Sequence, residues 1–226
     1  MRLLLIRHGQ TPNNVTGALD TAFPGAGLTS LGEAQARAVP GALADEDIAG
    51  VYASRLVRTQ LTAAPLAEAL GLEVGVRPGL EEVAAGDLEM HTERDSVHAY
   101  LDCLMHWMHG DLARAIPGGT DGHEFYEGFD AALCSIAEAH APDDTVAVFS
   151  HGGAIRVFTA LAARLDPDAS DDLRMMNTAW GVLEGHPGTG WELAHWHGDP
   201  LGGHQLEDQR AHDVTGESVE EGLDES

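Results

Sequence analysis

The sequence predicts an α/β domain, a three-layer α/β/α sandwich around a mostly parallel central sheet. Short apolar runs alternate with helical stretches along the chain, an order typical of parallel sheets covered by helices on both faces. Two of these runs, Leu3 to Ile6 and Thr145 to Phe149, are expected to be buried strands, and each leads to a polar residue followed by His-Gly. Ligands bind at the carboxyl ends of strands in such sheets, so we expect the functional residues there.

Local signals place the other elements. Ser30 and Glu33 have capping-box spacing and open a helix to about Leu43, in which Pro40 is expected to cause a kink or break. Ser54 is expected to cap the next helix, which Gly71 ends. Further helices are predicted at His91 to Gly110, at Phe125 to about His140, and from the turn at residues 150–153 to about Leu165. The remaining strands are predicted at Gly50 to Ala53, Leu72 to Val76, Ala179 to Leu183 and Trp191 to Trp196.

Length and composition indicate one compact domain and a tail. A chain of 226 residues that is 43% apolar can bury one full core, and we expect this domain to span residues 1–205. Residues 206–226 are acidic and almost free of large apolar side chains, so this tail is expected to be disordered. The apolar run at the N-terminus is too short for a signal peptide or a spanning helix, which favours a cytoplasmic protein.

The charge of the chain argues against two classes of partner. The formal net charge is −25, and all 12 basic residues are arginines. Nucleic acid and anionic membranes are therefore poor partners. Cys103 and Cys134 lack the paired spacing of a metal or redox site and are expected to be free thiols. The oligomeric state is left open, with a homodimer as one alternative.

Two histidines stand in matched contexts, in LLLIRHGQT at the start of the chain and in VAVFSHGGA around residue 149. His8 and His151 both follow an apolar strand, so the two side chains could lie side by side at neighbouring strand ends. Gly9 and Gly152 let the backbone come close to a ligand, and N–H groups at a helix N-terminus favour anions. The pattern predicts an anion-binding site that contains both histidines.

The first of these motifs carries a family resemblance. Arg7-His8-Gly9-Gln10-Thr11 with Asn14 resembles the signature of the histidine phosphatase superfamily, the phosphoglycerate mutase-like family. Segments that resemble this family follow in family order at Leu28 to Ala36, Tyr52 to Ala63, Leu80 to Glu89 and Ser150 to Gly153. The resemblance covers residues 2 to about 200. It implies a phosphoglycerate mutase-like fold and an enzyme that transfers a phosphoryl group.

The resemblance also implies a role for each matching residue. His8 matches the nucleophile that attacks phosphorus to give a phosphohistidine. Arg7 and Arg58 match the guanidinium groups that neutralise the phosphoryl oxygens. His151 matches a second histidine that donates a hydrogen bond to the phosphoryl group. The expected substrate-binding residues are Gly9, Gln10, Asn14 and Gly152.

Glu82 matches the general acid that protonates the departing alkoxide and later activates the hydrolytic water. Its neighbour Glu81 is a rival for this role. The four-residue step from Glu82 to Gly86 fits the family spacing, and like charges nearby could raise a carboxyl pKa toward the working range. Glu82 is therefore the preferred candidate.

No metal and no cofactor are expected, because Arg7, Arg58 and His151 account for charge neutralisation. His106 and His109 have helical i,i+3 spacing that could bind a metal ion. A structural or surface role is the expectation for both. The sequence departs from the family at Thr120-Asp121, where many relatives have Glu-Ser after Pro-Gly-Gly, so substrate contacts in that region are open.

The predicted function is a phosphatase that hydrolyses small phosphate monoesters through a phosphohistidine on His8. A phosphoglycerate mutase is the first alternative, and a non-catalytic phosphate-binding module is the second. Between Glu82 and His151 only Arg94 and Arg114 could bind the carboxylate of a phosphoglycerate, which favours hydrolysis over mutase activity. A pure binding module would have no use for a general acid, which argues against the second alternative.

Overall fold

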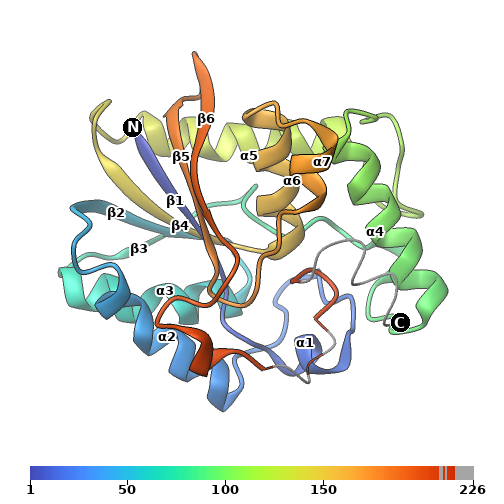
Figure 1. The fold of residues 1–226 in the computed structure, drawn as a ribbon, viewed down its shortest axis with the longest axis horizontal. Helices are drawn as coiled ribbons and strands as arrows, with labels where there is room; N and C mark the ends of the chain where they lie inside the picture. The colour runs from blue at the N-terminus through green and yellow to red at the C-terminus, as the bar shows by residue number, and fades with distance from the viewer. Residues whose placement is uncertain (209–210, 212, 217–226) are drawn as a thin grey trace.

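A six-stranded sheet in the order β3-β2-β4-β1-β5-β6 forms the centre of the protein, in a computed structural model that describes residues 1–208, 211 and 213–216 (Figure 1). The strands are β1 (Arg2–Arg7), β2 (Ile48–Ala53), β3 (Val74–Val76), β4 (Thr145–Ser150), β5 (Trp180–His186) and β6 (Gly190–His197). The first four strands in chain order pair in parallel. The hairpin of β5 and β6 adds two antiparallel strands beside β1.

Helices cover both faces of this sheet (Figure 1). They are α1 (Pro12–Thr16), α2 (Ser30–Ala42), α3 (Val57–Leu70), α4 (Arg94–Met108), α5 (Gly122–Ala137), α6 (Gly152–Ala162) and α7 (Pro167–Asp171). Short 3₁₀ turns occur at Gly86–Leu88 and His204–Leu206. Helices α2 and α3 lie on one side of the sheet, and α5 and α6 lie on the other.

Strand β1 shows why both faces must be covered. Leu3 and Leu5 pack in one hydrophobic cluster with α5 and α6, whereas Leu4 and Ile6 pack in a second cluster with α2 and α3. All four side chains are at most 1% exposed. Burying one such side chain contributes about 1.5–3 kcal/mol. An uninterrupted apolar run is the expected pattern for a strand of this kind.

The predicted fold class is confirmed, and the differences concern the element ends. Helix α2 is capped by Thr29, whose hydroxyl accepts the N–H of Gly32, and not by Ser30. Pro40 lies inside α2 and does not end it at once. Leu56, and not Ser54, is the N-cap of α3. The sequence analysis missed α1 and α7, which have five residues each and lack room for a periodic pattern.

Part of the predicted tail makes contacts with the domain. Residues 213–216 are placed against the interior, and the Asp213 side chain is buried. Its carboxylate pairs with a buried arginine, a long-range contact that local composition cannot reveal. Residues 209, 210, 212 and 217–226 lie outside the described residues.

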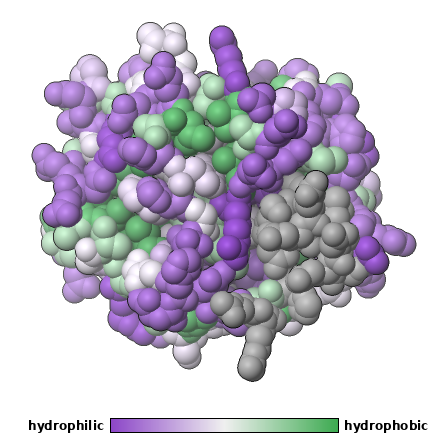
Figure 2. All heavy atoms as spheres, viewed as in Figure 1, coloured by the Kyte–Doolittle hydropathy of each residue, from purple (hydrophilic) through white to green (hydrophobic). Residues whose placement is uncertain are grey.

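The visible surface agrees with the charge of the chain. Hydrophilic side chains dominate the face shown in Figure 2, where apolar residues form small separate patches. Among the described residues, no helix is both long and apolar enough to cross a membrane.

The start of α2 presses against the loop that follows β1. A Cβ atom on Gly32 would overlap the carbonyl oxygen of Gln10, and one on Gly9 would come within 2.7 Å of the Gly32 carbonyl oxygen. We predict that Gly32→Ala lowers the free energy of unfolding by about 1–3 kcal/mol through overpacking, measured by urea denaturation.

Gly41 offers a control for this substitution in the same helix. A Cβ atom there would meet nothing within 4 Å. Gly41→Ala is therefore expected to stabilise the protein by about 0.5–1 kcal/mol, since alanine loses less conformational entropy in a helix. Equal effects of the two substitutions would contradict the proposed contact between α2 and the loop.

Candidate active site

Parallel pairing of β1 with β4 brings the two histidines together. Arg7 is in register with Ser150, so the residues that follow both strands emerge at the same edge of the sheet. The His8 N–H donates to the Ser150 carbonyl at 3.0 Å. The rings of His8 and His151 lie with their centroids 5.2 Å apart, in an edge-to-face arrangement.

The His8 ring is held in one orientation by the backbone. Its Nδ1 lies 2.8 Å from the carbonyl oxygen of Gly9. Since a carbonyl can only accept, Nδ1 carries the proton and Nε2 keeps its lone pair. Burial, together with the positive charges of Arg58 and Arg7, holds the pKa of His8 well below its usual value. His8 is therefore a neutral imidazole with one ring nitrogen suited to nucleophilic attack.

The His151 ring is held by Ser54, which the sequence predicted as a helix cap. Its Nε2 lies 2.9 Å from the Ser54 hydroxyl, which also accepts the N–H of Leu56. The other ring nitrogen, Nδ1, is buried and has no hydrogen-bond partner among the described residues. Burial and the charge of Arg58 lower the pKa of His151 well below its usual value. In the tautomer in which the Ser54 hydroxyl donates to Nε2, the proton lies on Nδ1, where it can be donated to a ligand.

Glu82 lies at the N-terminus of α6. Its carboxylate accepts hydrogen bonds from the N–H groups of Val83, Gly153 and Ala154, at 2.9, 3.1 and 2.7 Å. Burial raises the pKa of Glu82, although these backbone hydrogen bonds and Arg58 act in the opposite direction. The balance keeps the carboxyl protonated to a higher pH than usual, as a general acid requires.

The rival acid has other partners. Glu81 forms an ion pair with Arg55 and accepts the N–H of Gly79. Only Glu82 of the two lines the cavity that contains His8.

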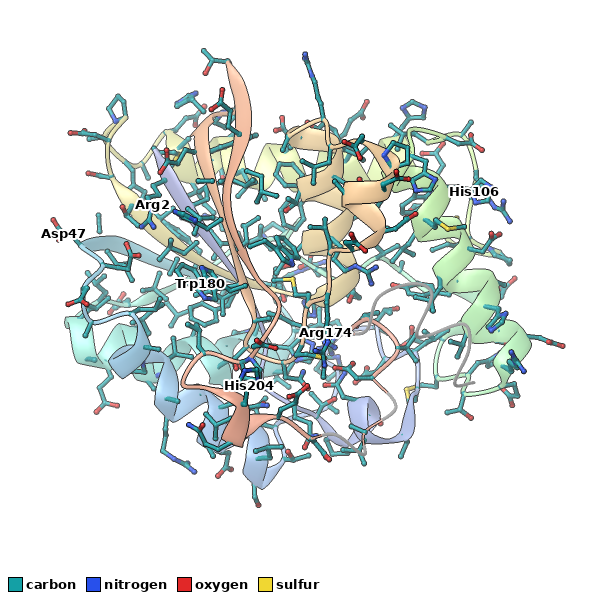
Figure 3. The ribbon with its side chains drawn as sticks, in the orientation of Figure 1. Arg2, Asp47, His106, Arg174, Trp180 and His204 are labelled. Carbon is teal, nitrogen blue, oxygen red and sulfur yellow. The ribbon has the colours of Figure 1, made fainter. Side chains whose placement is uncertain are left out.

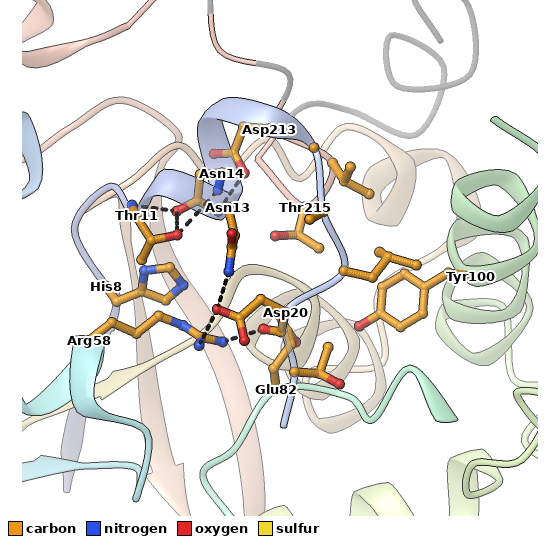
Figure 4. A pocket seen from close by; sticks show the side chains of 15 residues that line it. His8, Thr11, Asn13, Asn14, Asp20, Arg58, Glu82, Tyr100, Asp213 and Thr215 are labelled. Atoms are coloured by element: carbon orange, nitrogen blue, oxygen red, sulfur yellow. Dashed lines mark hydrogen bonds and ion pairs between the residues drawn. The ribbon is translucent and has the colours of Figure 1, made fainter. Parts of the chain in front are cut away.

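Arg58 crosses the site from α3 and is almost fully buried. Its Nη2 donates to the Asp20 carbonyl at 2.9 Å, and its Nη1 lies 3.6 Å from the Asp20 carboxylate. Nη1 makes no hydrogen bond among the described residues. Burial lowers the pKa of Arg58, while Asp20 and Glu82 raise it. A guanidinium with one unused donor is thus directed toward the cavity (Figure 4).

Arg7 is buried and already has an anionic partner. Its two Nη atoms each lie 2.6 Å from an oxygen of the Asp213 carboxylate, and Nη1 also donates to the Met175 carbonyl. Nε has no hydrogen-bond partner among the described residues. A Cβ atom on Gly152 would lie 3.0 Å from this Nε, so the free nitrogen faces the start of α6.

The cavity unites part of the predicted set (Figure 4). His8, Asn14, Arg58 and Glu82 line it, whereas Arg7 and His151 lie buried behind it. Three predicted substrate-binding residues are not part of the lining, namely Gly9, Gln10 and Gly152.

Gln10 holds the loop instead of facing the cavity. Its side chain donates to Asp208 and accepts from Thr29, while its N–H donates to Gln35. Asn14 holds the loop and also lines the cavity. Its carbonyl oxygen accepts from Thr11, and its Nδ2 donates to Asp213 at the cavity wall.

Several lining residues escaped the sequence analysis. Asp20, Thr21 and Tyr100 come from loops and from α4, and Asp213 comes from the tail. A hydrogen bond from the Tyr100 hydroxyl to the Val83 carbonyl holds the Glu82 segment against α4. Asp20 lies between the first two resembling segments, which end at Asn14 and begin at Leu28, so neither of them pointed to it.

The two histidines considered for a metal have other contacts. His106 lies on the outer side of α4, beside Asp102 and Arg114 (Figure 3), and His109 forms an ion pair with Asp171. Within the part of the chain that the structure describes, no group of three or more His, Cys, Asp and Glu side chains could hold a metal ion.

The fold and this histidine-arginine-carboxylate site define a class of phosphoryl-transfer proteins, and comparison with known proteins specifies it. The sequence profile of the Histidine phosphatase superfamily (branch 1) matches residues 3–199. The chain belongs to this family.

Individual relatives differ in length and name. The chain is 36% identical over 212 residues to a PE-PGRS family protein, PE_PGRS11, of Mycobacterium tuberculosis, where the match covers 87% of this chain and spans only 36% of the relative. It is 26% identical to an adenosylcobalamin/alpha-ribazole phosphatase of Salmonella typhimurium, with 81% of this chain and 90% of the relative covered. A probable phosphoglycerate mutase of Yersinia enterocolitica is 29% identical, with 87% and 90% covered.

Solved structures agree with the fold. A mycobacterial glucosyl-3-phosphoglycerate phosphatase in complex with VO3 superposes with a TM-score of 0.73 at 28% identity. The match covers 87% of this chain and 98% of that structure.

The pKa directions predict a bell-shaped pH profile for kcat/KM with an alkyl phosphate substrate. The active form needs neutral His8 and protonated Glu82. Because the pKa of His8 is lowered, activity is lost on the acid side only well below pH 6.5. Because the pKa of Glu82 is raised, activity persists above pH 4.5 and falls as Glu82 loses its proton.

The variant Glu82→Gln identifies the alkaline limb. It should lower kcat/KM by about 10²- to 10⁴-fold and leave the residual rate independent of pH on the alkaline side. An alkaline limb that survives unchanged in Glu82→Gln would belong to another group and would contradict the role given to Glu82.

Proposed function

We propose that this protein hydrolyses small phosphate monoesters through a phosphohistidine intermediate on His8. One observation carries the proposal. Arg7 Nε, Arg58 Nη1 and His151 Nδ1 are three buried nitrogen atoms around His8 without hydrogen-bond partners among the described residues. Buried donors are rarely left unpaired, because each costs about 1–3 kcal/mol. A bound phosphoryl group would supply acceptor oxygens to all three.

The site residues divide the reaction into two steps. His8 Nε2 attacks phosphorus and forms the N–P bond as the ester P–O bond breaks. Glu82 gives its proton to the leaving oxygen, so the product departs as an alcohol. In the second step a water attacks phosphorus, its proton passes to the Glu82 carboxylate, and the N–P bond breaks to release phosphate. Arg58, Arg7 and His151 stabilise the charge on the phosphoryl oxygens in both steps.

The charges of the cavity favour hydrolysis over a mutase reaction. A mutase must hold the carboxylate of a phosphoglycerate, which calls for a cation beyond the phosphate position. Arg58 is the only arginine among the described residues that line the cavity. Arg114 is bound to Asp102 and His106 on the outer side of α4, and Arg94 is exposed and outside the lining. Asp20 instead adds negative charge beside the cavity.

The relatives' names support small organic monoesters as substrates. One relative is called an adenosylcobalamin/alpha-ribazole phosphatase and a structural neighbour a glucosyl-3-phosphoglycerate phosphatase. Both names describe enzymes that release phosphate from a larger polar molecule. We propose the same reaction class for this chain, and its particular substrate remains to be found by screening phosphate esters.

Trapping the intermediate tests the nucleophile. After a rapid quench with labelled substrate, label should be found on His8 and should be stable in base and labile in acid. His8→Ala should lower turnover by more than about 1,000-fold. His106→Ala, which changes an exposed histidine on α4, should leave turnover unchanged. If His8→Ala keeps more than a few per cent of wild-type turnover, the phosphohistidine mechanism is wrong.

A second assay separates hydrolysis from phosphoryl return. The protein is supplied with 3-phosphoglycerate and catalytic bisphosphoglycerate, while 2-phosphoglycerate and free phosphate are followed together. We expect release of phosphate from several monoesters without isomerisation, because the described lining lacks a cation for the carboxylate. Interconversion of the phosphoglycerates that is much faster than phosphate release would instead establish a mutase.

A further inference from the structure

Residues 213–216 of the tail form one wall of the cavity. Asp213, Val214 and Thr215 all line it, and the Asp213 side chain is 2% exposed. One backbone hydrogen bond ties the segment to the rest of the domain, from the Met175 N–H to the Gly216 carbonyl at 2.8 Å. A second closes a turn within the segment, from the Gly216 N–H to the Asp213 carbonyl at 2.9 Å. The segment is thus seated on the site by specific contacts.

The Asp213 carboxylate occupies both Nη donors of Arg7, one of the guanidinium groups that the proposed mechanism places on the phosphoryl oxygens. Both Nη atoms of Arg7 lie 2.6 Å from its two oxygens, which is the paired geometry in which a guanidinium binds two oxygens of a phosphate. Asn14 Nδ2 donates to the same carboxylate at 3.2 Å. The Asn14 carbonyl oxygen accepts the N–H of Thr11, which fixes the orientation of this amide.

The seated segment leaves little room. The enclosed space of the cavity is about 30 Å³, enough for roughly two or three water molecules. Thr215 also presses on the start of α6, where a Cβ atom on Gly152 would come within 2.9 Å of the Thr215 hydroxyl oxygen. Asp213, Val214 and Thr215 thus form part of the wall of this small space, which also contains His8 and Arg58.

We propose that Asp213 is an internal ligand of the phosphate site, and that substrate binds only when it displaces residues 213–216. The protein then rests in a self-inhibited form in which a carboxylate occupies Arg7 and Asn14. The inference rests on the proposed function in one respect, namely that the displacing anion is a phosphoryl group. In the competing arrangement, Asp213 stays in place during catalysis and orients Arg7. The two arrangements predict opposite effects of Asp213→Asn on phosphate binding.

Asp213→Asn tests the competition. The amide removes the charge that holds Arg7, so the dissociation constant for inorganic phosphate and the KM for p-nitrophenyl phosphate should both fall by about three- to tenfold, as expected if the closed form is populated at about 70–90%. The kcat should change by less than about twofold. Asp199→Asn removes one charge from an exposed carboxylate outside the cavity lining and should change neither constant.

Lower kcat and weaker phosphate binding in Asp213→Asn would contradict the proposal. If Asp213 orients Arg7 for catalysis, Asp213→Asn lowers kcat and weakens phosphate binding, and the proposal is overturned. Tighter phosphate binding in Asp213→Asn by a protein that turns over no ester would contradict the proposed function and support the internal ligand.

Hydrogen exchange on the unmodified protein gives an independent measurement. The Met175 amide reports on the seated segment, because its hydrogen bond to the Gly216 carbonyl ties the segment to the rest of the domain. Saturating inorganic phosphate should speed exchange at Met175 by at least about tenfold, while the amide of Leu5 in β1 serves as the unaffected core reference. Unchanged or slower exchange at Met175 would show that phosphate binds beneath a fixed segment, which contradicts displacement.

Discussion

The parallel register of β1 and β4 is the constraint on which the site depends. It sets Arg7 opposite Ser150, so that the two His-Gly turns leave the sheet at one edge and at one level. A slip of one residue would turn each side chain of β1 to the other face, and the leucines that now fill two separate clusters would lose their partners. The packing that stabilises the domain therefore also fixes the distance between His8 and His151.

Burial then gives each polar group its chemical state. An imidazole surrounded by guanidinium groups and apolar walls stays neutral, and a carboxyl at the same depth keeps its proton. The α6 N-terminus moderates the second effect, since its N–H groups favour the charged form of Glu82. Burial and the N–H groups therefore act in opposite directions on the pKa of Glu82, and its proposed role uses both forms, since it gives a proton in one step and takes one in the next.

The sequence allowed the fold class, most strands and the motif residues to be predicted, because these depend on apolar runs and on short local spacings. Contacts between distant residues could not be predicted. Ser54 and His151 are 97 positions apart, and Arg7 and Asp213 are 206 apart. Composition alone predicted a disordered tail, since a run of acids around few apolar residues cannot form a core. Asp213, one of these acids, nevertheless pairs with the buried guanidinium of Arg7. A single long-range ion pair cannot be predicted from the composition of the tail.

The position of Asp213 in the chain has a consequence for how such proteins diversify. The family profile matches residues 3–199, so Asp213 lies outside the matched range. Selection can then change the resting activity by substitutions near the C-terminus without touching any residue that performs chemistry. Two members with the same histidines, arginines and glutamate can differ in how readily they accept a substrate. Activity inferred from the shared motif alone would miss that difference.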